Sequence, residues 1–169
     1  MANYAEVCGL EDEIRENGFE QTFTDDGPIC RWTKEGLLLD ILPTKPEIIG
    51  FSESLWFEQG FIRSLSYKLE GGEILLVFDI LYLLAAKIDA FKDRGKGDLF
   101  VSQDFEDIAT ILDGSINVWD RLAEELDVAV FVKEWLRGLD PETTEDAIAG
   151  HVGSQERARL LLRKIKECP

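Results

Sequence analysis

The sequence predicts an α+β protein with a small mixed sheet and a helical C-terminal half. Two pairs of strand-like runs come before residue 80, at 29–33 with 37–42 and at 65–69 with 73–78. After residue 80 the apolar residues recur at helical spacing instead. Strands grouped ahead of helices are typical of the α+β class. At 169 residues the chain has the length of a single domain with a substantial core.

The composition is that of an acidic protein. Lys and Arg number 18 and Asp and Glu number 34, so the formal charge is 18 − 34 = −16. This charge repels bare phosphate backbones, so nucleic-acid binding is not expected without a partner. The one dense basic stretch consists of Lys92, Arg94 and Lys96, close to Lys87.

The cysteines and the histidine limit which disulfides and metal sites the chain can form. Cys8, Cys30 and Cys168 are far apart and form no CxxC motif, so neither a disulfide framework nor a thiolate zinc site is expected. A reduced, cytoplasmic protein fits this pattern. His151 is the only histidine, which excludes multi-histidine metal sites. No apolar run reaches the ~18 residues of a membrane span, so no membrane association is expected.

The first part of the chain is expected to form a helix followed by a hairpin. Apolar residues recur at helical spacing over 3–17, and Asn17-Gly18 ends this helix. The segment 34–36 is short enough to join the runs 29–33 and 37–42 as a hairpin.

Asp40 interrupts the run 37–42, which is otherwise apolar on both faces. Such a run is typical of a strand in the middle of a covered sheet. A lone carboxylate there is costly unless a cation, a metal ion or a hydrogen-bond donor meets it. One partner is Arg31, which lies beside Asp40 across the hairpin in one register. The other interpretation is that Asp40, at the centre of the sheet, binds a metal ion or acts as a general base. The pattern leaves both interpretations open.

A long connection over 43–63, with a short helix near 54–60, separates this hairpin from the next. Gly71-Gly72 is a strong turn signal between the runs 65–69 and 73–78 and predicts the second hairpin. The later helices are expected at 79–93, in the acidic second part of the stretch 82–114, and at about 116–126, 128–138, 141–151 and 153–167.

The stretch 82–114 joins an apolar helix to an acidic amphipathic one. At 100° per residue, Lys87 and Arg94 lie along one border of the apolar face, so both cations are expected to point into one cleft. On the second helix Asp104 falls inside the apolar face and Asp107 lies beside it. Two simpler interpretations remain: Lys87 extends from the rim of the core into water, and Asp104 complements the dipole at the start of its helix.

Five phrases in a fixed order resemble one family. They are Gly18-Phe19, CRW at 30–32, LLLDILPT at 37–44, IIGFSESLWF at 48–57 and AAKIDAFKDRGKGDLFVSQDFEDI at 85–108. Together they resemble the nucleotidyltransferase-fold proteins of the AbiEii toxin type, which are relatives of the DNA polymerase β-like nucleotidyltransferases. The resemblance implies a nucleotidyltransferase-like core over 1–114, a helical part over 115–169 and a role related to toxin–antitoxin systems.

The family's reaction moves a nucleotidyl group from an NTP with the help of Mg²⁺ ions held by three carboxylates. The resemblance makes Asp40 the third of these carboxylates and makes Lys87 a residue that faces the nucleotide phosphates. It also places Asp104 and Asp107 near the same cleft. The candidate site residues are therefore Asp40, Lys87 and Asp104 for catalysis, Asp40 for the metal ion, Lys87, Arg94 and Lys96 for the nucleotide, and Arg31, Asp98 and Asp107 elsewhere in the cleft.

The chain departs from the family at the metal site. The Gly-Ser and Asp-x-Asp that carry the other two carboxylates are expected before the helix at 3–17, and residue 1 already lies past them. Asp40 alone would hold Mg²⁺ poorly, because the ion keeps its waters unless several oxygens meet it. We therefore expect a catalytically incomplete protein that binds a nucleotide weakly or binds a partner. The alternatives are an acidic protein-interaction scaffold and an active enzyme whose true start lies upstream of Met1.

Two further expectations concern contacts. Asp40, Lys87 and Asp104 are expected to converge on one cleft, because ionisable groups at apolar positions are best satisfied by each other. The run 37–42 is expected to be an apolar edge left unpaired by the absent strand. A homodimer would cover this edge, and the alternative is that the helix at 3–17 folds over it.

Overall fold

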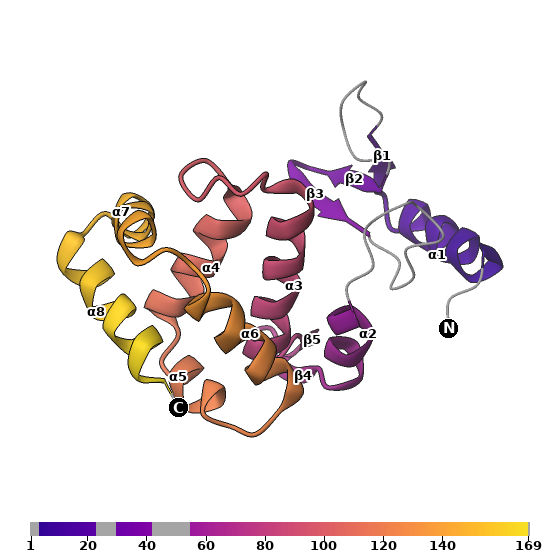
Figure 1. Cartoon of the computed structure of the whole chain (residues 1–169). Coiled ribbons are helices and arrows are strands. Elements are labelled where there is room, and N and C mark those ends of the chain that lie inside the picture. Colours follow the sequence, from indigo (N-terminus) through magenta and orange to yellow (C-terminus); the bar gives the residue numbers. More distant parts are fainter. Residues whose placement is uncertain (1–3, 23–29, 42–54, 169) are drawn as a thin grey trace. The chain divides into compact units, whose positions relative to one another are not determined.

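The computed structural model describes residues 4–22, 30–41 and 55–168 (Figure 1). The chain divides into two compact units between Glu53 and Ser54, and each unit is described by itself. The predicted α+β class with a helical C-terminal half is confirmed. The expectation of a single domain stays a prediction.

The described residues of the N-terminal unit form one helix and a three-stranded antiparallel sheet. Its elements are α1 (Tyr4–Glu16), β1 (Glu20–Gln21), β2 (Arg31–Lys34) and β3 (Leu37–Asp40), with strand order β1-β2-β3. Glu35 and Gly36 join β2 to β3, and both have positive φ, at 49° and 85°. Two such residues make the tight turn that suits the twist of a hairpin. Trp32 is buried in this unit, and the Arg15 guanidinium lies over its ring at 5.1 Å.

The predicted strands form, but the prediction that they share one sheet is wrong. β2 pairs with β3 in one antiparallel sheet, and β4 (Leu65–Lys68) pairs with β5 (Ile74–Val77) in another. β3 is an exposed edge strand rather than the middle of a covered sheet. Each hairpin closes across a short turn, whereas joining two hairpins needs contacts between distant residues, which local patterns do not specify. The ends of the predicted strands at Ile29 and Leu42, and the connection over 43–54, lie outside the described residues.

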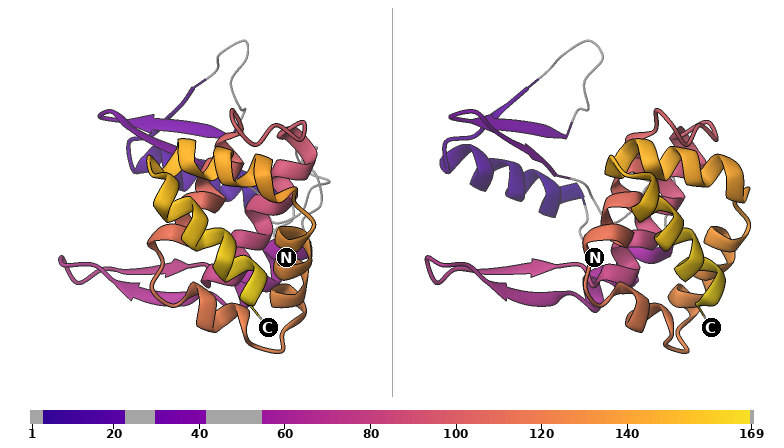
Figure 2. Two further views of the ribbon diagram at one scale, coloured as in Figure 1. Left: turned by 60° about the vertical axis from the view of Figure 1, so that its left-hand side comes forward. Right: turned by 90° about the vertical axis from the view of Figure 1, so that its left-hand side faces the viewer.

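The second unit is a body of helices from which the β4–β5 hairpin extends (Figure 2). The helices with predicted ranges match them within two residues at each end, except for α5. α5 is shorter than its predicted range of 116–126, since the chain is extended at Leu126. The helices are α2 (Leu55–Ile62), α3 (Ile80–Arg94), α4 (Gln103–Gly114), α5 (Val118–Leu122), α6 (Asp127–Arg137), α7 (Pro141–Val152) and α8 (Gln155–Glu167).

The core of the second unit is built around α3. The predicted apolar face of α3 is fully buried, and α2, α4, α5 and α6 all pack against this helix. Phe105 of α4 joins Phe91 of α3 and Trp135 of α6 in an aromatic cluster, with ring centroids 5.7–6.4 Å apart. α7 packs against α4 and α8. The helices after residue 114 therefore share one core with α3 and α4.

Candidate functional site

Four charged side chains meet where α3 and α4 pack side by side. The Arg94 guanidinium donates two hydrogen bonds to Asp104, from Nε to Oδ2 and from Nη2 to Oδ1, each of 2.7 Å. Lys87 Nζ lies 3.5 Å from Asp104 Oδ1 and 2.5 Å from Asp107 Oδ2. We call Lys87, Arg94, Asp104 and Asp107 the acid–base cluster. The predicted meeting of Lys87 with Asp104 is thus present in the structure.

The local sequence explains why a carboxylate is buried in this cluster. Asp104 lies in the first turn of α4, whose N-cap Ser102 accepts a hydrogen bond from the Phe105 amide. The positive end of the helix dipole therefore adds to the two cations. The Asp104 side chain is only 6% exposed, while that of Arg94 is 63% exposed. The cluster thus reaches from the edge of the core to the surface.

Within the cluster, the contact between Arg94 and Asp104 favours the ionised form of both groups. The hydrogen bonds from Arg94 lower the pKa of Asp104, and the charges of Arg94 and Lys87 add to this effect against the opposing cost of burial. The same hydrogen bonds raise the pKa of Arg94. Two cations and two carboxylates carry no net formal charge, so the cluster is an internally neutralised network.

Asp40 pairs with an arginine, whereas the catalytic role expected for it is to bind a metal ion. Arg31 Nε and Nη2 each donate a hydrogen bond of 2.7 Å to the two Asp40 oxygens, across the β2–β3 pair. These bonds lower the pKa of Asp40. Of the two interpretations that the sequence leaves open, the Arg31 pair is the one present. Asp40 belongs to the N-terminal unit and Lys87 and Asp104 to the second, so their convergence on one cleft stays a prediction.

The remaining cations of the basic stretch are not gathered in the acid–base cluster. Lys92 Nζ lies over the Phe131 ring, 4.3 Å from its centroid. Lys96 is exposed and has positive φ, as does the following Gly97, so the chain reverses direction there between α3 and α4. Lys96 and Asp98 instead line an open hollow of about 610 Å³.

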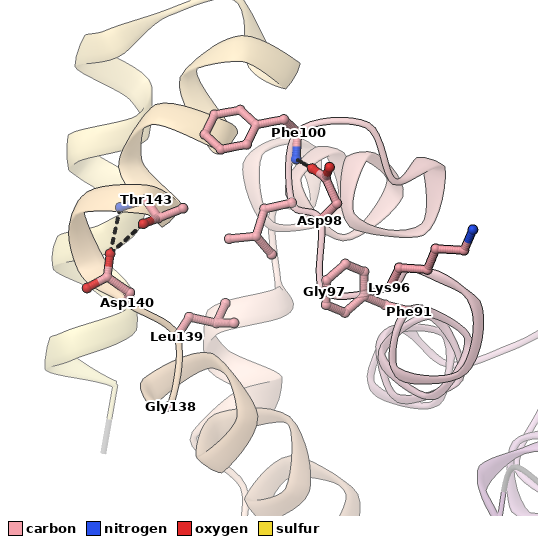
Figure 3. Close-up of a pocket in the computed structure, with 10 residues that line it drawn as sticks. Phe91, Lys96, Gly97, Asp98, Phe100, Gly138, Leu139, Asp140 and Thr143 are labelled. Atoms are coloured by element: carbon pink, nitrogen blue, oxygen red, sulfur yellow. Dashed lines mark hydrogen bonds between the residues drawn. The ribbon is translucent and has the colours of Figure 1, made fainter.

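This hollow lies between the loop after α3 and the connection from α6 to α7 (Figure 3). Its two carboxylates serve local turns: Asp98 accepts hydrogen bonds from the Phe100 and Val101 amides, and Asp140 accepts from the Thr143 amide and hydroxyl. The Lys96 side chain extends away from the hollow (Figure 3). With two acidic groups and no inward cation among its lining residues, the hollow does not suit a phosphate.

Several polar contacts in the second unit were not foreseen, and three of them involve Asp79, Arg121 and His151. Asp79 caps α3 by accepting from the Leu81 amide, and Arg121 of α5 donates to its other oxygen at 2.8 Å. His151 Nε2 lies 2.7 Å from the Leu99 carbonyl and ties α7 to the loop before α4. An Asp directly before an apolar helix signals an N-cap, so Asp79 had a local signal. Arg121 and His151 had none, since their partners are 42 and 52 residues away.

The fold and the site define an α+β protein with a helical body and an internally neutralised acid–base cluster. Comparison of the chain with models of protein families, with curated proteins and with solved structures found no match. Among the described residues, no group of three or more His, Cys, Asp and Glu side chains is placed to hold a metal ion. No helix in the described ranges is long and apolar enough to cross a membrane.

Proposed function

We propose that this chain is a nucleotidyltransferase-like protein that does not transfer nucleotides and acts by binding a protein partner, in a role related to toxin–antitoxin systems. The proposal combines the resemblance in the sequence with two features of the second unit. These features are the pairing of its candidate nucleotide-binding cations and the exposed apolar face of its hairpin. The free thiols of Cys30 and Cys168 fit a reducing cytoplasm as the place of action.

The first feature argues against a working triphosphate site at the acid–base cluster. A phosphate approaching Lys87 or Arg94 must compete with the Asp104 and Asp107 carboxylates, which are already in hydrogen-bond contact with these cations. Asp93 adds further negative charge near Arg94. Weak nucleotide binding that does not depend on Mg²⁺ is the most that this arrangement supports.

The observation that carries the proposal is the β4–β5 hairpin. Leu65, Tyr67, Leu75 and Val77 are between 39% and 60% exposed, although they are residues that proteins usually cover. A two-stranded hairpin alone is marginally stable in water and gains stability when another layer covers it. Contiguous exposed apolar surface is typical of an interaction site. We therefore place the partner on this hairpin.

The test is recovery of partners from cells of the source organism that carry a tagged and an untagged copy of the chain. We expect the tagged wild-type chain to bring down a stoichiometric partner, either another protein or the untagged copy. The variant Tyr67→Glu/Leu75→Glu should lose it. Ile116→Glu is the matched control, since Ile116 is 99% exposed and lies outside the hairpin. Equal recovery by wild type and the hairpin variant would refute the proposal.

A further inference from the structure

We infer that the partner is a second copy of this chain, and that two β4–β5 hairpins pack against each other through the same face. This inference rests on the proposed function and names the partner at the site given there. The argument depends on the register of the hairpin, on the charge of the chain and on the size of the exposed face.

The register divides the hairpin into two different faces. Residues directly opposite each other in an antiparallel pair point to the same side of the sheet. The pairs Leu65↔Val77 and Tyr67↔Leu75 therefore form one face, which carries only apolar and aromatic side chains. We call it the apolar hairpin face.

The opposite face has another character. Its pairs are Ser66↔Leu76 and Lys68↔Ile74, so each pair combines a polar side chain with an apolar one. Lys68 can keep this face in contact with water. Ile74 and Leu76 are exposed on this side as well, but the apolar hairpin face is the side whose strand pairs include no charged side chain and no serine.

The lack of charged side chains in the apolar hairpin face favours a second copy as the cover of this face. A partner selected for a chain of net charge −16 would be basic and would bind through ion pairs. The apolar hairpin face offers such a partner no charged group. Its best complement is another uncharged apolar surface, and the identical face of a second copy is one by construction. A two-fold axis lets both faces be covered in the same contact, which is the commonest symmetry of homo-oligomers.

The size of the face sets the strength of the contact. Four side chains per copy form its centre, whereas a standard interface uses about 20–30 residues a side. Both copies also carry the same large negative charge, which opposes their approach. We therefore expect a reversible dimer with Kd on the order of 10 µM.

The experiment is sedimentation velocity of the purified full chain at concentrations from about 1 to about 200 µM. Tyr67→Glu should weaken the dimer at least about tenfold, because it places a charge at the centre of the apolar hairpin face. Ser66→Glu adds the same charge to the neighbouring residue on the opposite face and should change Kd less than about threefold. Tyr67→Phe should retain the dimer. Far-UV circular dichroism of each variant checks that the helices remain.

Salt supplies an independent measurement on the wild-type chain. Raising NaCl from about 0.05 to about 0.5 M screens the repulsion between the two acidic copies, so the dimer should become tighter. An interface held by ion pairs would weaken instead, and that result would overturn the inference.

The other outcomes are equally clear. A chain that stays monomeric throughout, or equal effects of Tyr67→Glu and Ser66→Glu, would also overturn the inference. If such a monomer still recovers a different protein through its hairpin, the proposed function stands without self-association. If the hairpin variant changes neither recovery nor association, both proposals fail.

Discussion

Asp104 is a carboxylate in a place where the sequence pattern calls for an apolar side chain. Its charge is met by the bidentate guanidinium of Arg94, by Lys87 Nζ and by the N-terminal turn of α4. Burying a carboxylate without such partners would be costly. The simplest physical account of Lys87 and Arg94 is therefore that they satisfy Asp104 and hold α3 against α4.

Removing the guanidinium should destabilise the second unit. We expect Arg94→Met to lower the free energy of unfolding by about 1.5 kcal/mol, because Asp104 then keeps only the longer contact with Lys87. The value lies at the low end for a charged hydrogen bond, since solvent screens the exposed Arg94. Arg94→Lys should recover only part of the loss, because an ammonium cannot reproduce the bidentate geometry. Urea unfolding measures both effects, and no coupling in a double-mutant cycle with Asp104→Asn would contradict this account.

The lowered pKa of Asp104 also predicts how stability changes with pH. A carboxylate whose pKa is lower in the folded than in the unfolded chain stabilises the fold above its unfolded pKa of about 4. This contribution is lost as pH falls through the folded pKa. The stability difference between wild type and Asp104→Asn should therefore be largest near neutral pH and shrink in acid. Glu106→Gln, on the exposed side of the same helix, is the matched control, and a pH-independent difference for Asp104→Asn would refute the prediction.

At the scale of elements, α2 and α3 approach each other at a glycine. A Cβ added to Gly60 would lie 3.0 Å from Phe78 Cε2 and 3.1 Å from Tyr82 Cβ. Phe78 can shift, but Tyr82 Cβ is fixed to the backbone of α3. We expect Gly60→Ala to destabilise the second unit by about 1 kcal/mol, because the strain exceeds the gain in helix propensity. Thermal unfolding tests this, and a stabilised variant would mean that α2 moves freely away from α3.

The elements that the sequence predicted well are those whose signals are local. The helical face of α3 and the inward position of Asp104 follow from periodicity, and the hairpin turns follow from glycines and residues that accept positive φ. The pair Arg31–Asp40 was one of the two interpretations that the sequence left open, and local pattern could suggest it because the two residues lie only nine positions apart across a short turn.

The features that escaped prediction depend on contacts between distant segments. For 37–42 the sequence supported both a central strand and an edge left unpaired. The strand order makes β3 an edge, and side-chain hydrophobicity alone does not record which strands pair. The same limit applies to Arg121 with Asp79 and to His151 with Leu99, whose partners come together only when the helices pack. The meeting of charged side chains along α3 and α4 was thus predictable. The placement of Lys96 and Asp98 at the hollow, outside the acid–base cluster, was not.

At the scale of the whole molecule, charge and ion pairing bear on the reaction that the resemblance implies. Two-metal nucleotidyl transfer needs carboxylates free to hold ions about 4 Å apart and cations free to hold the triphosphate. Both oxygens of Asp40 accept hydrogen bonds from Arg31. Lys87 and Arg94 are in contact with carboxylates. The net charge of −16 adds a general repulsion toward a nucleotide.

We therefore expect the 169-residue chain to transfer no nucleotide. Incubation with each of the four labelled NTPs, with Mg²⁺ or Mn²⁺, and with total RNA or a protein extract should leave every acceptor unlabelled. Isothermal titration should find at most weak NTP binding, of similar strength with and without Mg²⁺, because the contacts come from paired side chains rather than from a metal-bridged triphosphate. Asp104→Asn is the informative comparison: it releases Arg94 and Lys87 from a carboxylate and should strengthen NTP binding if these cations meet the phosphates at all. Label transfer by the wild-type chain that disappears in Asp40→Ala would overturn this prediction, since Asp40 would then act on a metal ion and not only on Arg31.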